Sequence, residues 1–86
     1  MKYIKKFENY ELDDYVVVNT TALKDVYDNV PEKWLPFDLP VGKIIDNGAI
    51  KYHTGFISHV HKILRKATVE EIYEYNLMIA SKKYNL

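Results

Sequence analysis

Short runs of apolar residues, separated by turn residues, recur along this chain and are typical of a small antiparallel sheet. The β-branched run at residues 15–18 is the strongest strand candidate, and residues 41–45 are the next. Residues 46–48 read Asp-Asn-Gly, a tight-turn sequence in which Asn-Gly readily supplies positive φ. Residues 50–53 are therefore expected to return as the hairpin partner of residues 41–45.

A second turn is expected at Thr54-Gly55. In residues 56–64, which follow it, apolar and polar residues do not alternate regularly. Their alternate positions fall into two sets, and neither set is purely polar. This predicts one longer strand with a bulge or bend midway, or two short strands.

The clearest helix signal is the sequence Thr-Val-Glu-Glu at residues 68–71, a capping box. The Thr68 hydroxyl would accept from the amide of Glu71, whose carboxylate would return to the amide of Thr68. The spacing predicts a helix from Thr68 or Val69 to about Ser81. Its expected apolar stripe comprises Val69, Ile72, Tyr73, Ile79 and Ala80.

The segment between the first two strands is less regular. Residues 22–29 have roughly helical spacing, Thr20 or Thr21 could cap them, and Pro31 would end the helix. Residues 31–40 hold all three prolines of the chain together with Trp34 and Phe37. Proline at this density prevents regular structure, so we expect an ordered loop pinned where its aromatic residues are buried.

A strand at residues 15–18, a long insertion, a hairpin and then Ile-Leu-Arg-Lys-Ala-Thr-Val-Glu-Glu-Ile at residues 63–72 make a recognisable series. It resembles small SH3-like β-barrel proteins, which include uncharacterised open reading frames of phages and other viruses. The resemblance covers about residues 12–75 and brings no catalytic residues with it. It implies a mainly β (α+β) fold: a small SH3-like antiparallel barrel or curved sheet with an inserted long loop or short helix and a C-terminal helix.

The expected organisation is a single SH3-like domain over residues 1–86, with a β-rich barrel at about 12–66 and the helix at about 68–81. The chain has 86 residues, of which 48% are hydrophobic and 28% charged, and this balance is that of one small folded domain. A core this small makes a homodimer or another partner plausible.

The composition also excludes some kinds of chemistry and location. The chain has no cysteine, which removes disulfides, thiol catalysis and thiolate metal sites. Residues 1–8 lack the apolar core of a signal peptide, and no apolar run reaches membrane-spanning length. The expected location is the cytoplasm, that of the host cell if the protein is viral, with no membrane partner.

Three histidines, His53, His59 and His61, are the candidates for a metal site. His59 and His61 alternate by two, so in a straight strand both rings point to one side, and three imidazoles can bind zinc. No acidic residue lies within residues 49–69 to support them. The expectation is therefore no metal and no cofactor.

The loop between the first two strands is the main candidate for a binding surface. Aromatic anchors with a charged rim are what protein interfaces use as hot spots. The alternative is that Trp34 and Phe37 merely plug the end of the barrel. The candidate protein-binding residues are Trp34, Leu35, Phe37, Asp25, Asp28 and Glu32.

A second candidate surface is the basic segment at residues 41–66, which has five bases against one acid, whereas residues 20–40 have four acids against two bases. Small barrels can bind nucleic acid through a basic sheet with stacking aromatics, although strand lysines are also ordinary solubility residues. The net charge of zero argues against general electrostatic binding. The residues of this alternative are Lys43, Lys51, Tyr52, Lys62, Arg65 and Lys66.

No phosphate-binding glycine loop, nucleophile elbow or acidic metal motif occurs in the sequence, so we do not expect an enzyme. Abundant Lys, Asn, Ile and Tyr indicate an AT-rich coding sequence, as in many phages and plasmids. The leading hypothesis is a small non-catalytic protein-binding module, encoded by a phage or mobile element. It would modulate or inhibit a host protein, as anti-restriction and anti-CRISPR factors do. The alternative is a nucleic-acid-binding SH3-like domain that uses the basic 41–66 face.

Overall fold

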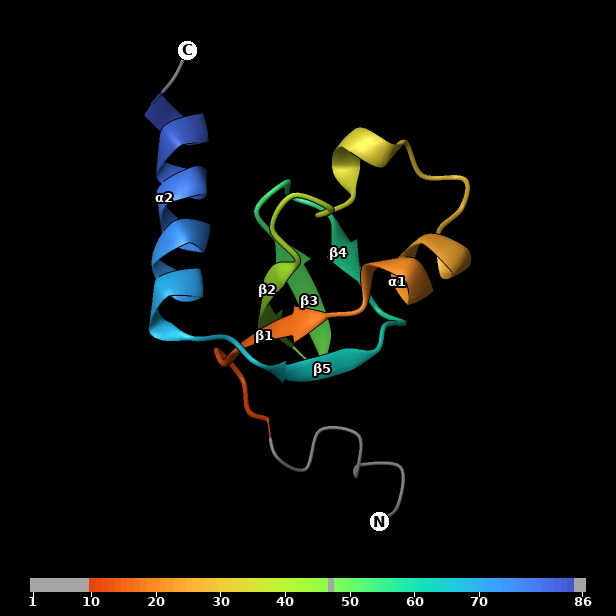
Figure 1. Ribbon diagram of the computed structural model, residues 1–86, viewed down its shortest axis with the longest axis horizontal. Coiled ribbons are helices and arrows are strands. Elements are labelled where there is room, and N and C mark those ends of the chain that lie inside the picture. The colour runs from red at the N-terminus through yellow and green to blue at the C-terminus, as the bar shows by residue number, and fades with distance from the viewer. Residues whose placement is uncertain (1–9, 47, 85–86) are drawn as a thin grey trace.

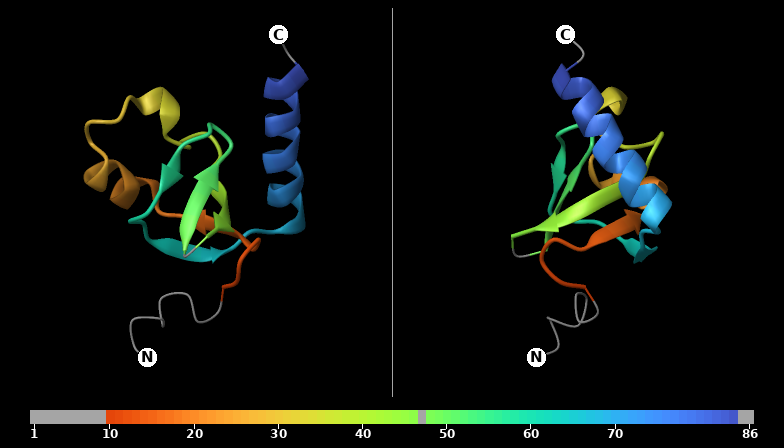
Figure 2. Two further views of the ribbon diagram at one scale, coloured as in Figure 1. Left: turned by 180° about the vertical axis from the view of Figure 1, so that it is seen from behind. Right: turned by 90° about the vertical axis from the view of Figure 1, so that its left-hand side faces the viewer.

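The computed structural model describes residues 10–46 and 48–84. Its helical elements are α1 (Thr20–Val26), the short 3₁₀ turn η2 (Glu32–Trp34) and α2 (Val69–Tyr84). Helix α2 stands on one side of a central sheet, and α1 lies on the other (Figure 1). The view from behind shows the same order, with the sheet between the two helices (Figure 2).

The sheet has five antiparallel strands in the order β4-β3-β2-β1-β5. Its strands are β1 (Tyr15–Val18), β2 (Val41–Ile45), β3 (Ala49–Tyr52), β4 (Ile57–Ser58) and β5 (Ile63–Lys66). The predicted strands at residues 15–18 and 41–45 and the predicted hairpin are confirmed. The mixed pattern at residues 56–64 is resolved as two short strands separated by a bend.

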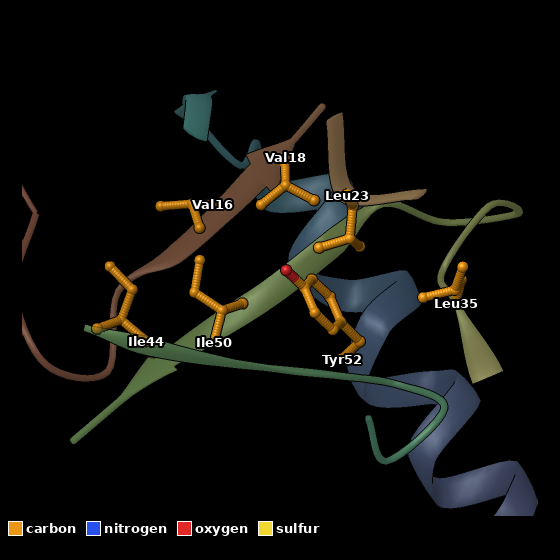
Figure 3. Packing of buried hydrophobic residues seen from close by; sticks show 7 residues of the cluster. All are labelled: Val16, Val18, Leu23, Leu35, Ile44, Ile50 and Tyr52. Carbon is orange, nitrogen blue, oxygen red and sulfur yellow. The ribbon is translucent and has the colours of Figure 1, made fainter. Parts of the chain in front are cut away.

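The two faces of the sheet bury different clusters because side chains alternate along each strand. On β1, Val16 and Val18 point to one face and Val17 points to the other. The first cluster is the main core, which combines the strands with Leu23 of α1 and Leu35 of the following loop (Figure 3). The second cluster lies under α2 and comprises Val17, Leu39, Val41 and Tyr75.

The sheet is not closed into a barrel. Strand β1 lies between β2 and β5, so the first and last strands are neighbours, but β4 and β5 are the two edges. A small antiparallel α+β fold with an inserted helix and a C-terminal helix is therefore confirmed, in the form of an open sheet. The register between β1 and β5 shifts between Val17 and Val18, which bends the sheet at this point.

Helix α1 begins two residues earlier than the predicted start at Ala22, and its cap is different. Asn19 is the N-cap: its Oδ1 accepts from the amide of Ala22 at 2.9 Å. The prediction of Thr20 or Thr21 as the cap was wrong, because asparagine in an extended conformation satisfies the first free amides equally well. Leu23 is the buried residue of this helix and joins it to the main core.

Helix α2 packs on the sheet through a face that the sequence pattern identified only in part: Ile79 of the expected stripe packs against the second cluster, but the buried Tyr75 was not expected. Tyr75 is 2% exposed, makes an edge-to-face contact with Tyr15, and donates its hydroxyl to the carbonyl oxygen of Lys51 at 2.9 Å. Burial raises the pKa of Tyr75 to about 12, so its hydroxyl stays protonated. The expected stripe was wrong for Val69 and Tyr73, which are 82% and 65% exposed.

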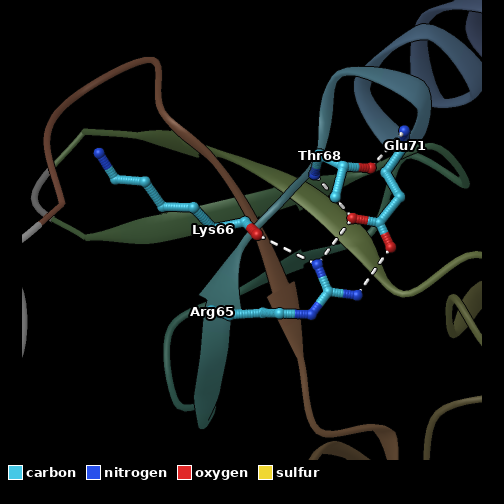
Figure 4. A network of polar contacts seen from close by, with 4 residues as sticks. All are labelled: Arg65, Lys66, Thr68 and Glu71. Atoms are coloured by element: carbon cyan, nitrogen blue, oxygen red, sulfur yellow. Dashed lines mark hydrogen bonds and ion pairs between the residues drawn. The ribbon is translucent and has the colours of Figure 1, made fainter.

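The start of α2 is the predicted capping box, reinforced by Arg65. The amide of Glu71 donates to Thr68 Oγ1 at 3.2 Å, and the amide of Thr68 donates to Glu71 Oε1 at 2.8 Å. Arg65 on β5 adds two hydrogen bonds of 2.9 Å to the same carboxylate (Figure 4). These contacts from Arg65, followed by those from Thr68, lower the pKa of Glu71 to about 2.

The lowered pKa of Glu71 makes the stability of the domain depend on pH in the acid range. Because the pKa of Glu71 is below its ordinary 4.5, its contribution is complete above about pH 4.5 and is lost as the pH falls towards 2. Glu71→Gln should cost about 1 kcal/mol of unfolding free energy at pH 7, and this cost should shrink steadily as the pH falls from about 4.5 to 2. Urea unfolding of both proteins from pH 7 to pH 2 measures this difference. Glu70→Gln on the same turn is the control, and an E71Q effect that does not change with pH would contradict the assignment.

Candidate functional site

An open pocket of about 420 Å³ lies where three separate segments meet. The η2 turn contributes Glu32 and Lys33, and the loop between η2 and β2 contributes Leu35, Phe37 and Asp38. The β3–β4 turn contributes His53 and Thr54, and α2 contributes Met78 and Ser81. We call this the loop–helix pocket. Because its walls come from three distant parts of the chain, the complete fold is needed to form it.

The loop at residues 31–40 is held in place by buried anchors, and we call it the anchored loop. Leu35 is 2% exposed, and Pro36 is among the largest fully buried side chains. The η2 turn closes with a bond from the amide of Leu35 to the carbonyl of Glu32 at 3.0 Å. Thr54 on the β3–β4 turn donates its hydroxyl to the carbonyl of Trp34 at 2.6 Å. The loop is thus ordered, but the expectation that its aromatic residues would be the buried anchors was wrong, because Leu35 and Pro36 fill that role.

Trp34 and Phe37 lie on either side of the buried Leu35–Pro36 pair and point outward. The exposed fractions of these two side chains are 53% and 42%. An exposed position is the one that the binding interpretation of these residues requires, whereas a plug at the end of the core would be buried. The anchored loop therefore presents two large aromatic side chains to solvent from a fixed backbone.

His53 and Asp38 form a polar pair at the pocket wall. The imidazole of His53 is 4% exposed, and its Nε2 lies 3.0 Å from Oδ1 of Asp38, whose side chain is 63% exposed. An ionised carboxylate only accepts, so Nε2 carries the proton and donates. Within the described residues, His53 Nδ1 has no hydrogen-bond partner. No local sequence pattern indicates this pair, because the two residues are 15 positions apart in the chain.

The other two histidines lie in different surroundings. His61 Nδ1 is 2.9 Å from the hydroxyl of Ser58, which is itself 2.7 Å from the hydroxyl of the buried Tyr52. His59 is exposed. Over residues 10–46 and 48–84, no group of three or more histidine or acidic side chains could hold a metal ion. The zinc arrangement that the sequence left open does not form among these residues.

The predicted protein-binding residues are brought together only in part. Glu32, Leu35 and Phe37 line the loop–helix pocket, and Trp34 is next to them on the anchored loop. Asp25 lies on α1 and Asp28 follows its end, both exposed and neither part of the pocket wall. Asp38, His53 and Met78 belong to the site and were missed.

The predicted basic surface is partly neutralised. Arg65 is held by Glu71, Lys43 lies 3.6 Å from Asp13, and Lys66 lies 3.6 Å from Asp14. Lys43 is the cross-strand neighbour of Lys51, and Lys62 is exposed before β5.

Tyr52 had been expected to stack on bases, but it is fully buried in the main core. Its hydroxyl bonds to Ser58, and burial raises its pKa. The expectation that Tyr52 is a surface stacking residue was wrong. The alternation of residues in the hairpin did not show which face of β3 would pack against the main core.

No family model, curated protein or solved structure matches this chain. In the described ranges, α2 is the longest helix, and no helix has the length and apolar character needed to cross a membrane. Any function must therefore be argued from the surfaces and the pocket described above.

Proposed function

We propose that this protein is a small non-catalytic protein-binding module whose binding surface is the anchored loop. The observation that carries the proposal is the exposure of Trp34 and Phe37 beside the buried Leu35–Pro36 anchor. A small domain that needs apolar residues for its core would gain by burying these two rings. Their outward placement on a fixed backbone fits a surface that is covered by a partner.

The energetics of such a surface favour tight recognition. Covering the exposed half of a tryptophan removes roughly 100 Å² of apolar surface from water, worth about 2–3 kcal/mol. Because the anchored loop is already held by Thr54 and by its own buried residues, little further ordering is needed on binding. Aromatic residues in this setting are the usual hot spots of protein interfaces.

The test of the proposal is Trp34→Ala. We expect the variant to keep a melting temperature near wild type and to lose about tenfold or more in partner affinity. The partner would be captured on the immobilised full chain from a lysate of the candidate host, with and without nuclease, and identified by mass spectrometry. Leu64→Ala is the matched control, because Leu64 on β5 has the same exposed fraction of 53% as Trp34.

Three results would contradict the proposal. A Trp34→Ala variant that retains the partner would show that the anchored loop is not the binding surface. A variant that loses stability and binding in equal measure would make Trp34 a core residue. Loss of the captured material on nuclease treatment would favour the nucleic-acid alternative, which the ion pairs of Lys43, Arg65 and Lys66 make the weaker candidate.

The origin of the protein belongs to the same proposal. The AT-rich coding bias and the resemblance to small SH3-like phage and viral proteins support a phage or mobile-element protein that acts on a host protein, of the anti-restriction or anti-CRISPR type. The neighbouring positions of β1, β2 and β5 support the SH3-like interpretation, because a small barrel needs its first and last strands side by side. Cytoplasmic location and a possible homodimer stay predictions.

A further inference from the structure

We propose that the loop–helix pocket receives a basic side chain, an arginine or a lysine, of the protein partner. This inference rests on the proposed function and gives the partner a chemical character. The anchored loop would then supply two kinds of contact. Trp34 and Phe37 would cover apolar surface of the partner, and the pocket would hold one cationic anchor.

The charge of the pocket is the first argument. Two carboxylates, Glu32 and Asp38, line the pocket together with a single cation, Lys33. The Asp38 side chain is 63% exposed, so its carboxylate is open to a ligand. One of its oxygens takes a bond from His53, and its remaining lone pairs can accept from a guanidinium or an ammonium group.

The apolar wall of the pocket is the second argument. Leu35, Phe37 and Met78 line it from the anchored loop and from α2. Arginine and lysine carry long aliphatic stems that pack on such surfaces while the charged head reaches a polar group. The ring of Phe37, which is 42% exposed, also offers a face for a cation. The carboxylates of the pocket can therefore bind the charged head of a basic side chain, and its apolar wall can pack against the aliphatic stem.

His53 is the third argument. Because His53 Nδ1 has no hydrogen-bond partner in the described residues, burying this imidazole carries a desolvation cost of about 1–3 kcal/mol. Its Nε2 nevertheless holds the carboxylate of Asp38 at the pocket wall, 3.0 Å away. We therefore assign His53 as a positioning residue that fixes the direction of Asp38.

The experiment is an NMR titration of the ¹⁵N-labelled full chain with acetyl-Gly-Arg-Gly-amide. The same titration with the corresponding citrulline peptide, which has the shape of arginine without its charge, measures the contribution of the charge. We expect saturable shifts at the amides of Asp38, His53 and Thr54, with an affinity at least about fivefold higher for arginine than for citrulline. A lysine peptide should shift the same amides, because the recognised feature is the cation.

Three variants test whether the preference for arginine comes from the pocket or from general electrostatics. Asp38→Asn should abolish the preference for arginine, while Asp25→Asn, which removes the same charge from an exposed position on α1, should leave it unchanged. His53→Leu should keep the melting temperature at or above that of the wild type and weaken arginine binding by about threefold or more. A residue with a purely structural role would show the opposite pattern, with lower stability and unchanged binding.

The inference is overturned by equal shifts from arginine and citrulline peptides, by no shifts at about 20 mM peptide, or by a preference that survives Asp38→Asn. Its failure is distinguishable from failure of the proposed function. The peptide titration needs no natural partner, whereas the capture experiment with Trp34→Ala does not depend on the pocket. A chain that captures its partner through Trp34 but shows no arginine preference would retain the function and lose only this inference.

Discussion

Gly42→Ala is expected to destabilise this domain severely, by about 3 kcal/mol or more. Gly42 on β2 pairs with Tyr52 on β3, and a Cβ placed on Gly42 would lie 2.9 Å from two ring atoms of Tyr52 and closer still to Cγ2 of Ile50. Both neighbours are fully buried, so neither can move without disturbing the main core. A small domain has roughly 4–13 kcal/mol of stability, and the melting temperature should fall by about 12 °C or more.

Gly55→Ala is the matched control for this prediction. Gly55 has a φ of 96°, but a Cβ there would meet no atom within 4 Å, so the cost is backbone strain alone, about 1 kcal/mol. Thermal and urea unfolding of the two variants should therefore separate them clearly. Equal stability of G42A and the wild type would show that the backbone of β2 lies further from Tyr52 than the structure places it.

Leu35→Ala should be the second most damaging change, at about 2–5 kcal/mol of unfolding free energy. Leu35 is 2% exposed and packs with Leu23 and Tyr52 in the main core. It is also the point at which the anchored loop is fixed to that core. We therefore expect both a lower urea midpoint and a lower partner affinity, because the positions of Trp34 and Phe37 depend on this anchor.

Phe37→Ala provides the contrast, since Phe37 is two residues further along the loop and 42% exposed. Its removal should change stability by less than about 1 kcal/mol while still weakening the binding of the partner. A Leu35→Ala variant that is destabilised but binds normally would show that the loop is positioned by other contacts, such as the bond from Thr54 to Trp34.

The sequence predicted those parts of the fold that depend on local interactions. The β1 strand, the β2–β3 hairpin and the capping box at Thr68 each rest on residues close together in the chain, and all three are confirmed. The face of α2 that packs was not predictable in the same way. Apolar residues are spread around much of the circumference of that helix, so their spacing alone does not define one face. Tyr75 lies on the face that packs, where its hydroxyl donates to the carbonyl of Lys51.

The candidate site was predictable only at the anchored loop. Aromatic residues among prolines left two interpretations open, a binding surface or a plug at the end of the core, and the exposure of Trp34 agrees with the first. The pair of His53 and Asp38 and the contribution of Met78 depend on long-range packing, which no local pattern records. The same limit explains Tyr52: its burial follows from the position of α1 and Leu23, not from its own strand.

The central position of β1 also governs how the chain can be assembled during synthesis. Strand β1 is among the first described segments to leave the ribosome, yet Val17 pairs with Arg65 near the other end of the chain. One edge of β1 therefore stays open until residues 63–66 have emerged, while β2, β3 and β4 can pair as local hairpins. The β-branched run that makes β1 the strongest strand signal is thus also the segment that waits longest for its second neighbour.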